Sequence, residues 1–123
     1  MLQLVIWVAL GGAAGGALRH AVSQGVHRLA GSEFPWGTLV VNDSGAALIG
    51  VLAASLPDTA THTASAALLV GLCGSFTTVS SFSLQTLALM RSGRPLRAAV
   101  NVIGSVTLCM GAVGAGVAAG SLL

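Results

Sequence analysis

The chain has 123 residues, of which 54% are hydrophobic and 7% are charged. A domain of this size has too little interior to hide so much apolar surface, so the composition excludes an ordinary soluble protein and predicts an integral membrane protein. The formal net charge of +2 comes with no lysine. The chain therefore lacks the dense basic patches that phosphate recognition requires, which excludes a nucleic-acid-binding protein.

Four apolar runs predict four transmembrane helices, at about residues 4–22, 36–56, 63–90 and 98–122. Each run approaches or exceeds the roughly 20 residues that a helix needs to cross a hydrocarbon core. The segments between them are short and contain the glycines or prolines that end helices, at residues 23–35, 57–62 and 91–97. We therefore expect residues 1–123 to form a single all-α membrane domain.

Small residues recur at every fourth position in the first and last runs. The repeated positions are Gly11 and Gly15, Gly12 and Gly16, and Ala112, Gly116 and Gly120. This spacing lets two helix backbones approach closely in lipid, where no hydrophobic force draws helices together. We expect at least two tight helix contacts. Because four short helices leave little room for an aqueous path inside one subunit, we also expect an oligomer.

All the arginines lie toward one end of the predicted bundle, at Arg19, Arg28, Arg91, Arg94 and Arg97. Arg19 is near that end of the first helix, and the others belong to the segments 23–35 and 91–97. Cytoplasmic loops of membrane proteins carry an excess of arginine and lysine. We therefore predict that these two segments face the cytoplasm at the cell membrane and that both termini lie outside.

A polar cluster interrupts the third apolar run, where residues 71–83 read GLCGSFTTVSSFS. Hydroxyl groups near the centre of a bilayer find no partner in lipid, so such a segment persists only where protein buries it or where it lines an ion path. The cluster therefore predicts a protein that moves a small polar solute. The chain contains no phosphate-binding loop and no Ser-His-Asp or metal-ligand constellation, so we do not expect an enzyme.

Four segments of the chain resemble the Fluc (CrcB-type) fluoride-channel family in order and spacing. They are GGAAGGALRH, which contains Arg19, FPWGTLVVN, which ends at Asn42, then SGAALIG, and finally GLCGSFTTVSSFS. The resemblance covers nearly the whole chain. It implies a fluoride-selective channel subunit that passively exports cytoplasmic fluoride and so protects against its toxicity. It also implies an antiparallel (inverted) dimer with two narrow pores and a third helix that is broken near its middle.

The resemblance further implies a structural sodium ion at the dimer interface, held by the backbone carbonyls of Gly74 and Thr77 where the third helix breaks. Hard cations prefer oxygen ligands, and an unwound helix inside the membrane frees carbonyl groups, so this chemistry is consistent with the residues. A glycine kink that holds no ion is the alternative.

The candidate fluoride path contains five residues: Asn42, Thr78, Val79, Phe82 and Ser105. A dehydrated fluoride ion needs donors in place of water, which amides, hydroxyls or the positive edge of an aromatic ring can supply. By resemblance, Phe82 corresponds to a pore phenylalanine and Ser105 to a position in a polar track. The alternatives are that Asn42 bonds another helix, that Phe82 packs against core or lipid, and that Ser105 bonds within its own helix.

Three residues depart from the family pattern. Val79 stands where the first of two paired phenylalanines is expected, and Asn101 stands where tyrosine is usual. Asp43 places a carboxylate where an apolar residue is common, and such a charge is costly in the membrane unless it is paired, protonated or turned to an interface. We expect Arg19, beside Asn42, to pair with Asp43; a water-exposed vestibule position is the alternative.

The departures and the one-sided arginines predict a dimer with a homologous subunit of opposite orientation, with a homodimer as the alternative. Two other functions stay open. A small proton-coupled multidrug exporter also uses four short spans, but it needs a membrane carboxylate, typically in the first helix, and only Asp43 is available here. A non-conducting partner subunit of a heterodimeric channel is suggested by Val79.

Overall fold

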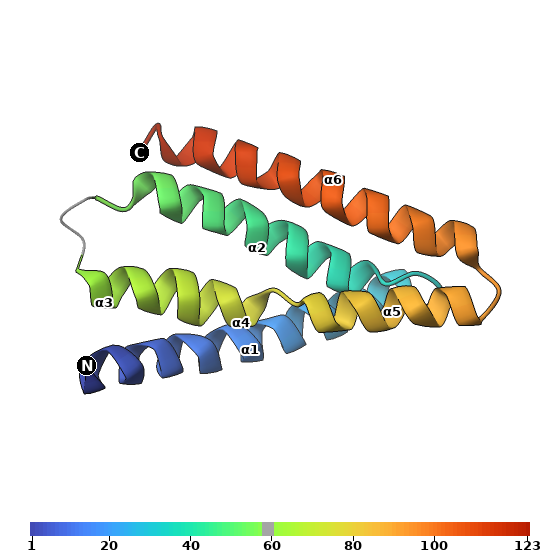
Figure 1. Ribbon diagram of the computed structural model, residues 1–123, viewed down its shortest axis with the longest axis horizontal. Helices are drawn as coiled ribbons and strands as arrows, with labels where there is room; N and C mark the ends of the chain where they lie inside the picture. The colour runs from blue at the N-terminus through green and yellow to red at the C-terminus, as the bar shows by residue number, and fades with distance from the viewer. Residues whose placement is uncertain (58–60) are drawn as a thin grey trace.

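The computed structural model describes residues 1–57 and 61–123, and these residues contain helices and no strand. The elements are α1 (Leu2–Ala30), α2 (Trp36–Ser55), α3 (His62–Ser65), the wide π-helical segment η1 (Ala66–Cys73), α4 (Gly74–Phe76), α5 (Val79–Arg91) and α6 (Pro95–Gly120). Segments α3 to α5 together form one interrupted third span, which runs beside α1 and α2 (Figure 1). Both termini lie at the same end of the bundle (Figure 1).

The all-α prediction with four spans is confirmed, because four helical stretches are long and apolar enough to cross a membrane. They are Leu2–Ala30, Trp36–Ser55, His62–Arg91 and Pro95–Gly120. Large apolar side chains such as Leu10, Leu84 and Ile103 are exposed on the outside of the bundle, where they face lipid in a multi-pass membrane protein. Part of the predicted connection 57–62, residues 58–60, lies outside the described residues.

The predicted end of the first helix at residue 22 is wrong, since α1 continues to Ala30. Hydropathy falls after residue 22, but nothing in the next turns forbids a helix, so α1 continues as a polar extension. It ends at Gly31, whose φ of 81° is readily adopted only by glycine and whose N–H donates to the carbonyl of His27. The last helix starts at Pro95 rather than residue 98, because proline is well suited to the first turn of a helix.

Glycines form a seam between α1 and η1. A Cβ atom added at Gly11 would collide with the carbonyl oxygen of Ala67, and one at Gly15 with that of Leu72. Gly71, on η1, allows the same close approach to the backbone of α1. The predicted contact at Gly11 and Gly15 is therefore confirmed, whereas Gly16 has open space around its Cβ position and takes no part.

A second seam joins α2 to α6. A Cβ atom at Gly116 would collide with the carbonyl oxygen of Ala47, and one at Gly120 would lie 2.5 Å from that of Val51. Gly50 on α2 makes the reciprocal approach to α6. Close backbone packing of this kind supplies the van der Waals contact that holds helices together in lipid, so the prediction at Gly116 and Gly120 is also confirmed.

The third span is interrupted between Phe76 and Val79, as predicted. Thr77 has φ −80° and ψ 157°, and Thr78 has φ −149° and ψ 123°, so both residues are extended. The N–H and the hydroxyl of Thr77 both bond to the carbonyl of Cys73, at 3.1 Å and 3.0 Å, which closes α4. A new helix, α5, then starts at Val79.

We predict that Gly116→Ala lowers the free energy of unfolding in detergent by about 1–3 kcal/mol, because the added methyl group must push α6 away from α2. The matched control is Gly114→Ala on the same helix, where the Cβ position is open. The control should not lower stability and can raise it by up to about 1 kcal/mol, because alanine favours a helix more than glycine does. Equal losses in the two variants, measured by denaturant titration, would show that the seam does not depend on close approach.

Candidate functional site

The side chain of Asn42, which belongs to α2, forms hydrogen bonds to the backbone where the third span is interrupted. Its Oδ1 accepts a 2.7 Å hydrogen bond from the N–H of Thr78, and its Nδ2 donates a 2.9 Å bond to the carbonyl of Thr78. One amide thus satisfies the donor and the acceptor of a single backbone residue. Backbone groups inside a membrane must be satisfied by protein, so this reciprocal pair stabilises an extended residue at that depth.

The start of α5 is capped by Thr78. Its Oγ1 accepts a 3.2 Å hydrogen bond from the N–H of Ser81, as an N-cap side chain does. In an unbroken helix the N–H of Ser81 would bond to the carbonyl of Thr77, and the N–H of Thr78 to the carbonyl of Gly74. Both amides donate elsewhere, so the carbonyls of Gly74 and Thr77 lose their helical partners.

Gly45 makes room for the interruption on the same face of α2, three residues after Asn42. A Cβ atom at Gly45 would lie 2.5 Å from Cγ2 of Thr77 and 3.1 Å from Cδ1 of Phe76. Any larger residue would displace Thr77 and pull the Asn42 pair apart. Sequence reasoning did not single out this glycine, although its spacing from Asn42 places it on the same helix face.

The five predicted path residues come together around one cavity. This cavity, the path cavity, has a volume of about 170 Å³ and is lined by Asn42, Thr78, Val79, Phe82, Ser105, Val106 and Cys109. It lies where α2, α5 and α6 face one another beside the interruption. Val79 is 77% exposed, so its side chain covers only the rim of the cavity.

Hydrogen bonds tie α5 to α6 next to the path cavity. Asn101, which is 2% exposed, donates from Nδ2 to the hydroxyl of Thr86 at 2.9 Å. The hydroxyl of Thr86 in turn donates to the carbonyl of Phe82 at 2.7 Å, and Ser105 contacts Asn101 Oδ1 at 3.5 Å. The structure therefore gives Asn101 a buried structural contact. Thr86 was missed from the sequence, although it lies one helical turn after Phe82.

A second cavity lies on the arginine side of the interruption. This cavity, the vestibule, has a volume of about 210 Å³ and is lined by Gly16, Arg19, His20, Ser23, Thr38, Val41, Thr78, Ser81 and Gln85. Thr78 lines both the vestibule and the path cavity. The interruption therefore lies at the junction between a polar chamber that contains Arg19 and a narrower chamber that contains Phe82.

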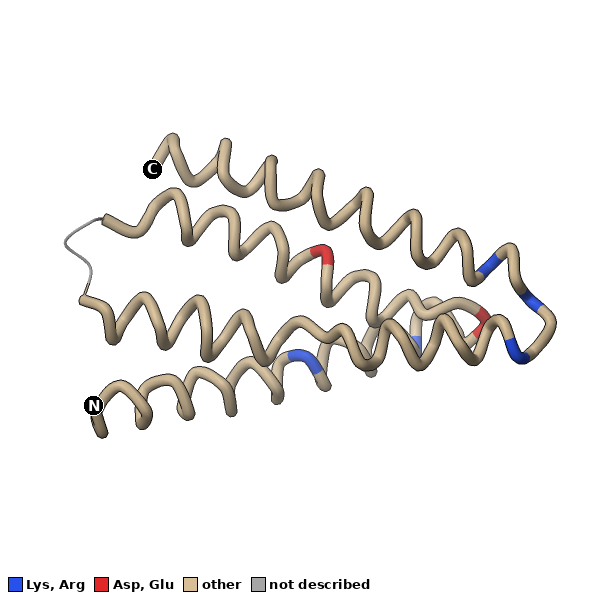
Figure 2. Tube along the Cα trace, viewed as in Figure 1, with Lys and Arg blue, Asp and Glu red and all other residues tan. Residues whose placement is uncertain are grey.

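The expected ion pair between Arg19 and Asp43 is absent from the described part of the chain, where the salt-bridge contact is Arg97 with Glu33 at 3.3 Å. Asp43 lies midway along α2, whereas most arginines lie at one end of the bundle (Figure 2). Its Oδ1 atom is buried and makes no hydrogen bond within the described residues. Asp43 lines neither the vestibule, which contains Arg19, nor the path cavity, which contains Asn42.

A metal ion held by acidic, thiol or imidazole groups is not supported, because the described residues contain no cluster of three or more such side chains. The backbone carbonyls of Gly74 and Thr77 are among the oxygen atoms at the interruption that lose their helical partners. Carbonyl oxygens suit a hard cation. The donor set at the interruption thus fits sodium better than a transition metal.

Comparison with known proteins gives matches over most of the chain. Residues 6–117 match the family described as CrcB-like protein, Camphor Resistance (CrcB). A protein of Paramagnetospirillum magneticum named fluoride-specific ion channel FluC is 46% identical over 120 residues, which cover 94% of each chain. The fluoride-specific ion channel FluC 2 of Bradyrhizobium diazoefficiens is 44% identical over 124 residues, covering 94% of this chain and 88% of the relative. A FluC of Methylococcus capsulatus is 48% identical over 89% of this chain and 49% of the relative.

We predict that Asn42→Ala lowers the free energy of unfolding by about 1–3 kcal/mol, because the N–H of Thr78 loses its acceptor and the carbonyl of Thr78 loses one of its donors. Hydrogen exchange at the Thr78 amide should become faster at the same time. The control is Ser44→Ala on the same helix, since the exposed Ser44 hydroxyl bonds only to carbonyls of its own helix. Similar stability and unchanged Thr78 exchange in the two variants would contradict the role of Asn42.

Proposed function

This chain belongs to the CrcB-like family, and from that membership and the geometry of the site we propose that it is a subunit of a fluoride-selective ion channel. The observation that carries the proposal is the path cavity, where Asn42, Thr78, Phe82 and Ser105 converge from three helices. The channel passively exports cytoplasmic fluoride and thereby protects the cell against fluoride toxicity. The family is one of ion channels, which is not an enzyme class.

The path cavity offers the kinds of contact that a dehydrated fluoride ion needs. Asn42 uses one Nδ2 hydrogen on Thr78 and keeps a second for an anion. The hydroxyls of Thr78 and Ser105 are further donors, and the ring edge of Phe82 carries partial positive charge. Donors that replace water in this way favour a small, strongly hydrated anion.

Export needs no coupled energy source. Neutral hydrogen fluoride enters and dissociates in the more alkaline cytoplasm, and the trapped anion then leaves through the pore. A negative interior drives an anion outward with about 2.3 kcal/mol per charge for each 100 mV. The arginine-bearing ends of the helices face the cytoplasm and both termini face outward.

The conducting unit is an antiparallel dimer, because one subunit leaves its path cavity incomplete. Val79 is 77% exposed at the rim, so the cavity is open on this side in a single chain, and a second chain would close it. The one-sided arginines favour a homologous partner of opposite orientation, which can supply the aromatic contact that Val79 lacks. An inverted second copy of this chain is the alternative partner.

A sodium ion at the dimer interface would be held by the backbone carbonyls of Gly74 and Thr77. The support is that the amides expected to bond these two carbonyls donate to Asn42 and Thr78 instead. A cation there would satisfy oxygens that lipid cannot, and it would fix the interruption in place. Asp43, whose Oδ1 is buried without a partner, is proposed to be protonated or turned toward the partner.

The exporter alternative has less support. A proton-coupled exporter of bulky cations needs a carboxylate in its binding cavity, and Asp43 does not line the path cavity or the vestibule. A path cavity of about 170 Å³ is also small for an aromatic cation. The second alternative, a non-conducting partner subunit, would be favoured if a homologue alone conducts fully.

We predict that Phe82→Ile lowers fluoride efflux from liposomes about five- to tenfold, because it removes a ring-edge contact of about 1 kcal/mol from the ion in transit. A fluoride electrode measures the rate. The matched control is Leu87→Ile, an exposed position on the same helix that lines no described cavity. The chain is tested alone and together with a homologue of opposite arginine bias. Flux from an inverted homodimer alone would exclude the heterodimer, and no flux in either case would exclude the channel.

We predict that exchanging sodium for N-methylglucamine lowers the thermal stability of the dimer. With sodium at about ten to a hundred times its dissociation constant, the loss is about 1–3 kcal/mol. Potassium, which is larger, serves as the control cation and should not restore the melting temperature. A melting temperature that is the same in all three solutions would show that no sodium site exists.

A further inference from the structure

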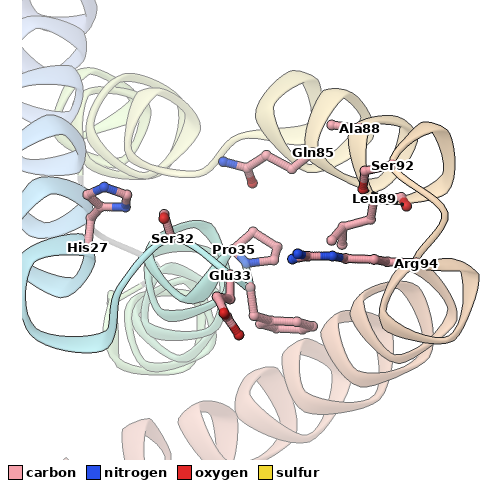
Figure 3. A pocket seen from close by; sticks show the side chains of 10 residues that line it. His27, Ser32, Glu33, Pro35, Gln85, Ala88, Leu89, Ser92 and Arg94 are labelled. Atoms are coloured by element: carbon pink, nitrogen blue, oxygen red, sulfur yellow. Dashed lines mark hydrogen bonds between the residues drawn. The ribbon is translucent and has the colours of Figure 1, made fainter.

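A third cavity opens at the arginine-bearing end of the bundle. This cavity, the mouth cavity, has a volume of about 360 Å³ and is lined by His27, Ser32, Glu33, Phe34, Pro35, Gln85, Ala88, Leu89, Ser92 and Arg94. Figure 3 shows the Arg94 side chain reaching from the α5–α6 turn across to the α1–α2 connection, with Gln85 and His27 on the far side of the cavity. The function described above does not use it.

Arg94 is the charged residue of the mouth cavity lining that has no ion-pair partner among the described residues. The other charged lining group, Glu33, is already paired with Arg97 at 3.3 Å, and Arg97 also donates to the carbonyl of Glu33 at 3.2 Å. Arg94 makes no ion pair with any described residue. A positive charge held in a concave surface attracts anions and raises their local concentration.

The three cavities lie next to one another, since neighbouring cavities share a lining residue. Gln85 lines both the mouth cavity and the vestibule, and Thr78 lines both the vestibule and the path cavity. The Oε1 atom of Gln85 is buried and accepts no hydrogen bond from the described residues. The side-chain amide of Gln85 therefore lies at the boundary between two chambers and is not engaged by other helices.

The cavities become smaller along this series, from about 360 Å³ to 210 Å³ to 170 Å³. A water molecule occupies about 30 Å³ of liquid, so the mouth cavity has room for an anion with its hydration shell. The lining is most polar in the vestibule and least polar in the path cavity, where Val79, Phe82 and Val106 appear. An anion that follows the series would lose its water mainly after Thr78.

We infer that the mouth cavity is the capture site of the channel, where Arg94 draws hydrated fluoride from solution and delivers it past Gln85 to the vestibule. The inference rests on the proposed channel function and adds a binding site and an access route to it. Arg94 acts on the ion before dehydration and through charge alone. Its effect should therefore depend on ionic strength, unlike that of a residue in the path cavity.

The test compares Arg94→Gln with Arg91→Gln, because Arg91 is an exposed arginine at the same end that does not line the mouth cavity. Fluoride efflux is measured in the conducting dimer with an impermeant potassium salt on both sides. At about 0.01 M ionic strength the Debye length is about 30 Å, and at about 1 M it is about 3 Å. We expect R94Q to lower the low-salt rate about two- to fivefold and R91Q to lower it less than about 1.5-fold.

The inference is decided by the flux of the variants at low and high salt. It is supported if the loss in R94Q disappears at high salt and if Arg94→Lys, which keeps the charge, conducts like the unaltered channel. It is overturned if R94Q and R91Q lower the rate equally, or if R94K loses as much flux as R94Q. When the unaltered dimer conducts and R94Q matches it at low salt, only the capture site fails; when the unaltered dimer does not conduct, the proposed function fails.

Discussion

Backbone groups inside a lipid bilayer cannot form hydrogen bonds to water, so protein groups must bond them. At the interruption of the third span, the two hydrogen bonds between the Asn42 side chain and the backbone of Thr78 meet this requirement. Without them, the N–H of an extended residue in mid-membrane would have no acceptor. The pair also decides where the break falls, because it takes the N–H of Thr78 away from Gly74. Three features follow from this placement: Thr78 caps the N–H of Ser81, the carbonyls before it lose their helical partners, and α5 starts at Val79.

Close packing of the surrounding helices keeps the Asn42 side chain within hydrogen-bond distance of the Thr78 backbone. Gly45 lets α2 approach Thr77 closely, and the seams of α1 with η1 and of α2 with α6 hold the helices that carry each half of the site. The interruption thereby lies between the vestibule and the path cavity, with Thr78 lining both. A polar chamber before the break and a narrower, less polar chamber after it form the arrangement that ion dehydration requires.

The sequence predicted the four spans and the small-residue seams, because hydropathy and four-residue spacing depend on local pattern. The motif order singled out five residues that the structure brings together around one cavity. From sequence, a bond from Asn42 to another helix was only an alternative, and its partner, Thr78, which is 36 positions away, was not identified. The close approach of Gly45 to Thr77 was also not predicted. The extension of α1 to Ala30 was missed because hydropathy reports where lipid ends, not where a helix ends. The expected pairing of Asp43 with Arg19 is absent because Asp43 does not line the vestibule that contains Arg19, and sequence leaves the rotation of a helix about its axis open.

The most direct test of the interruption is a density map of the dimer in lipid nanodiscs at a resolution that shows side-chain amides. The account predicts extended backbone at Thr77 and Thr78, the Asn42 amide against the Thr78 backbone, and the carbonyls of Gly74 and Thr77 turned toward the partner subunit. A continuous helix through these residues, or an Asn42 side chain that faces lipid, would contradict it.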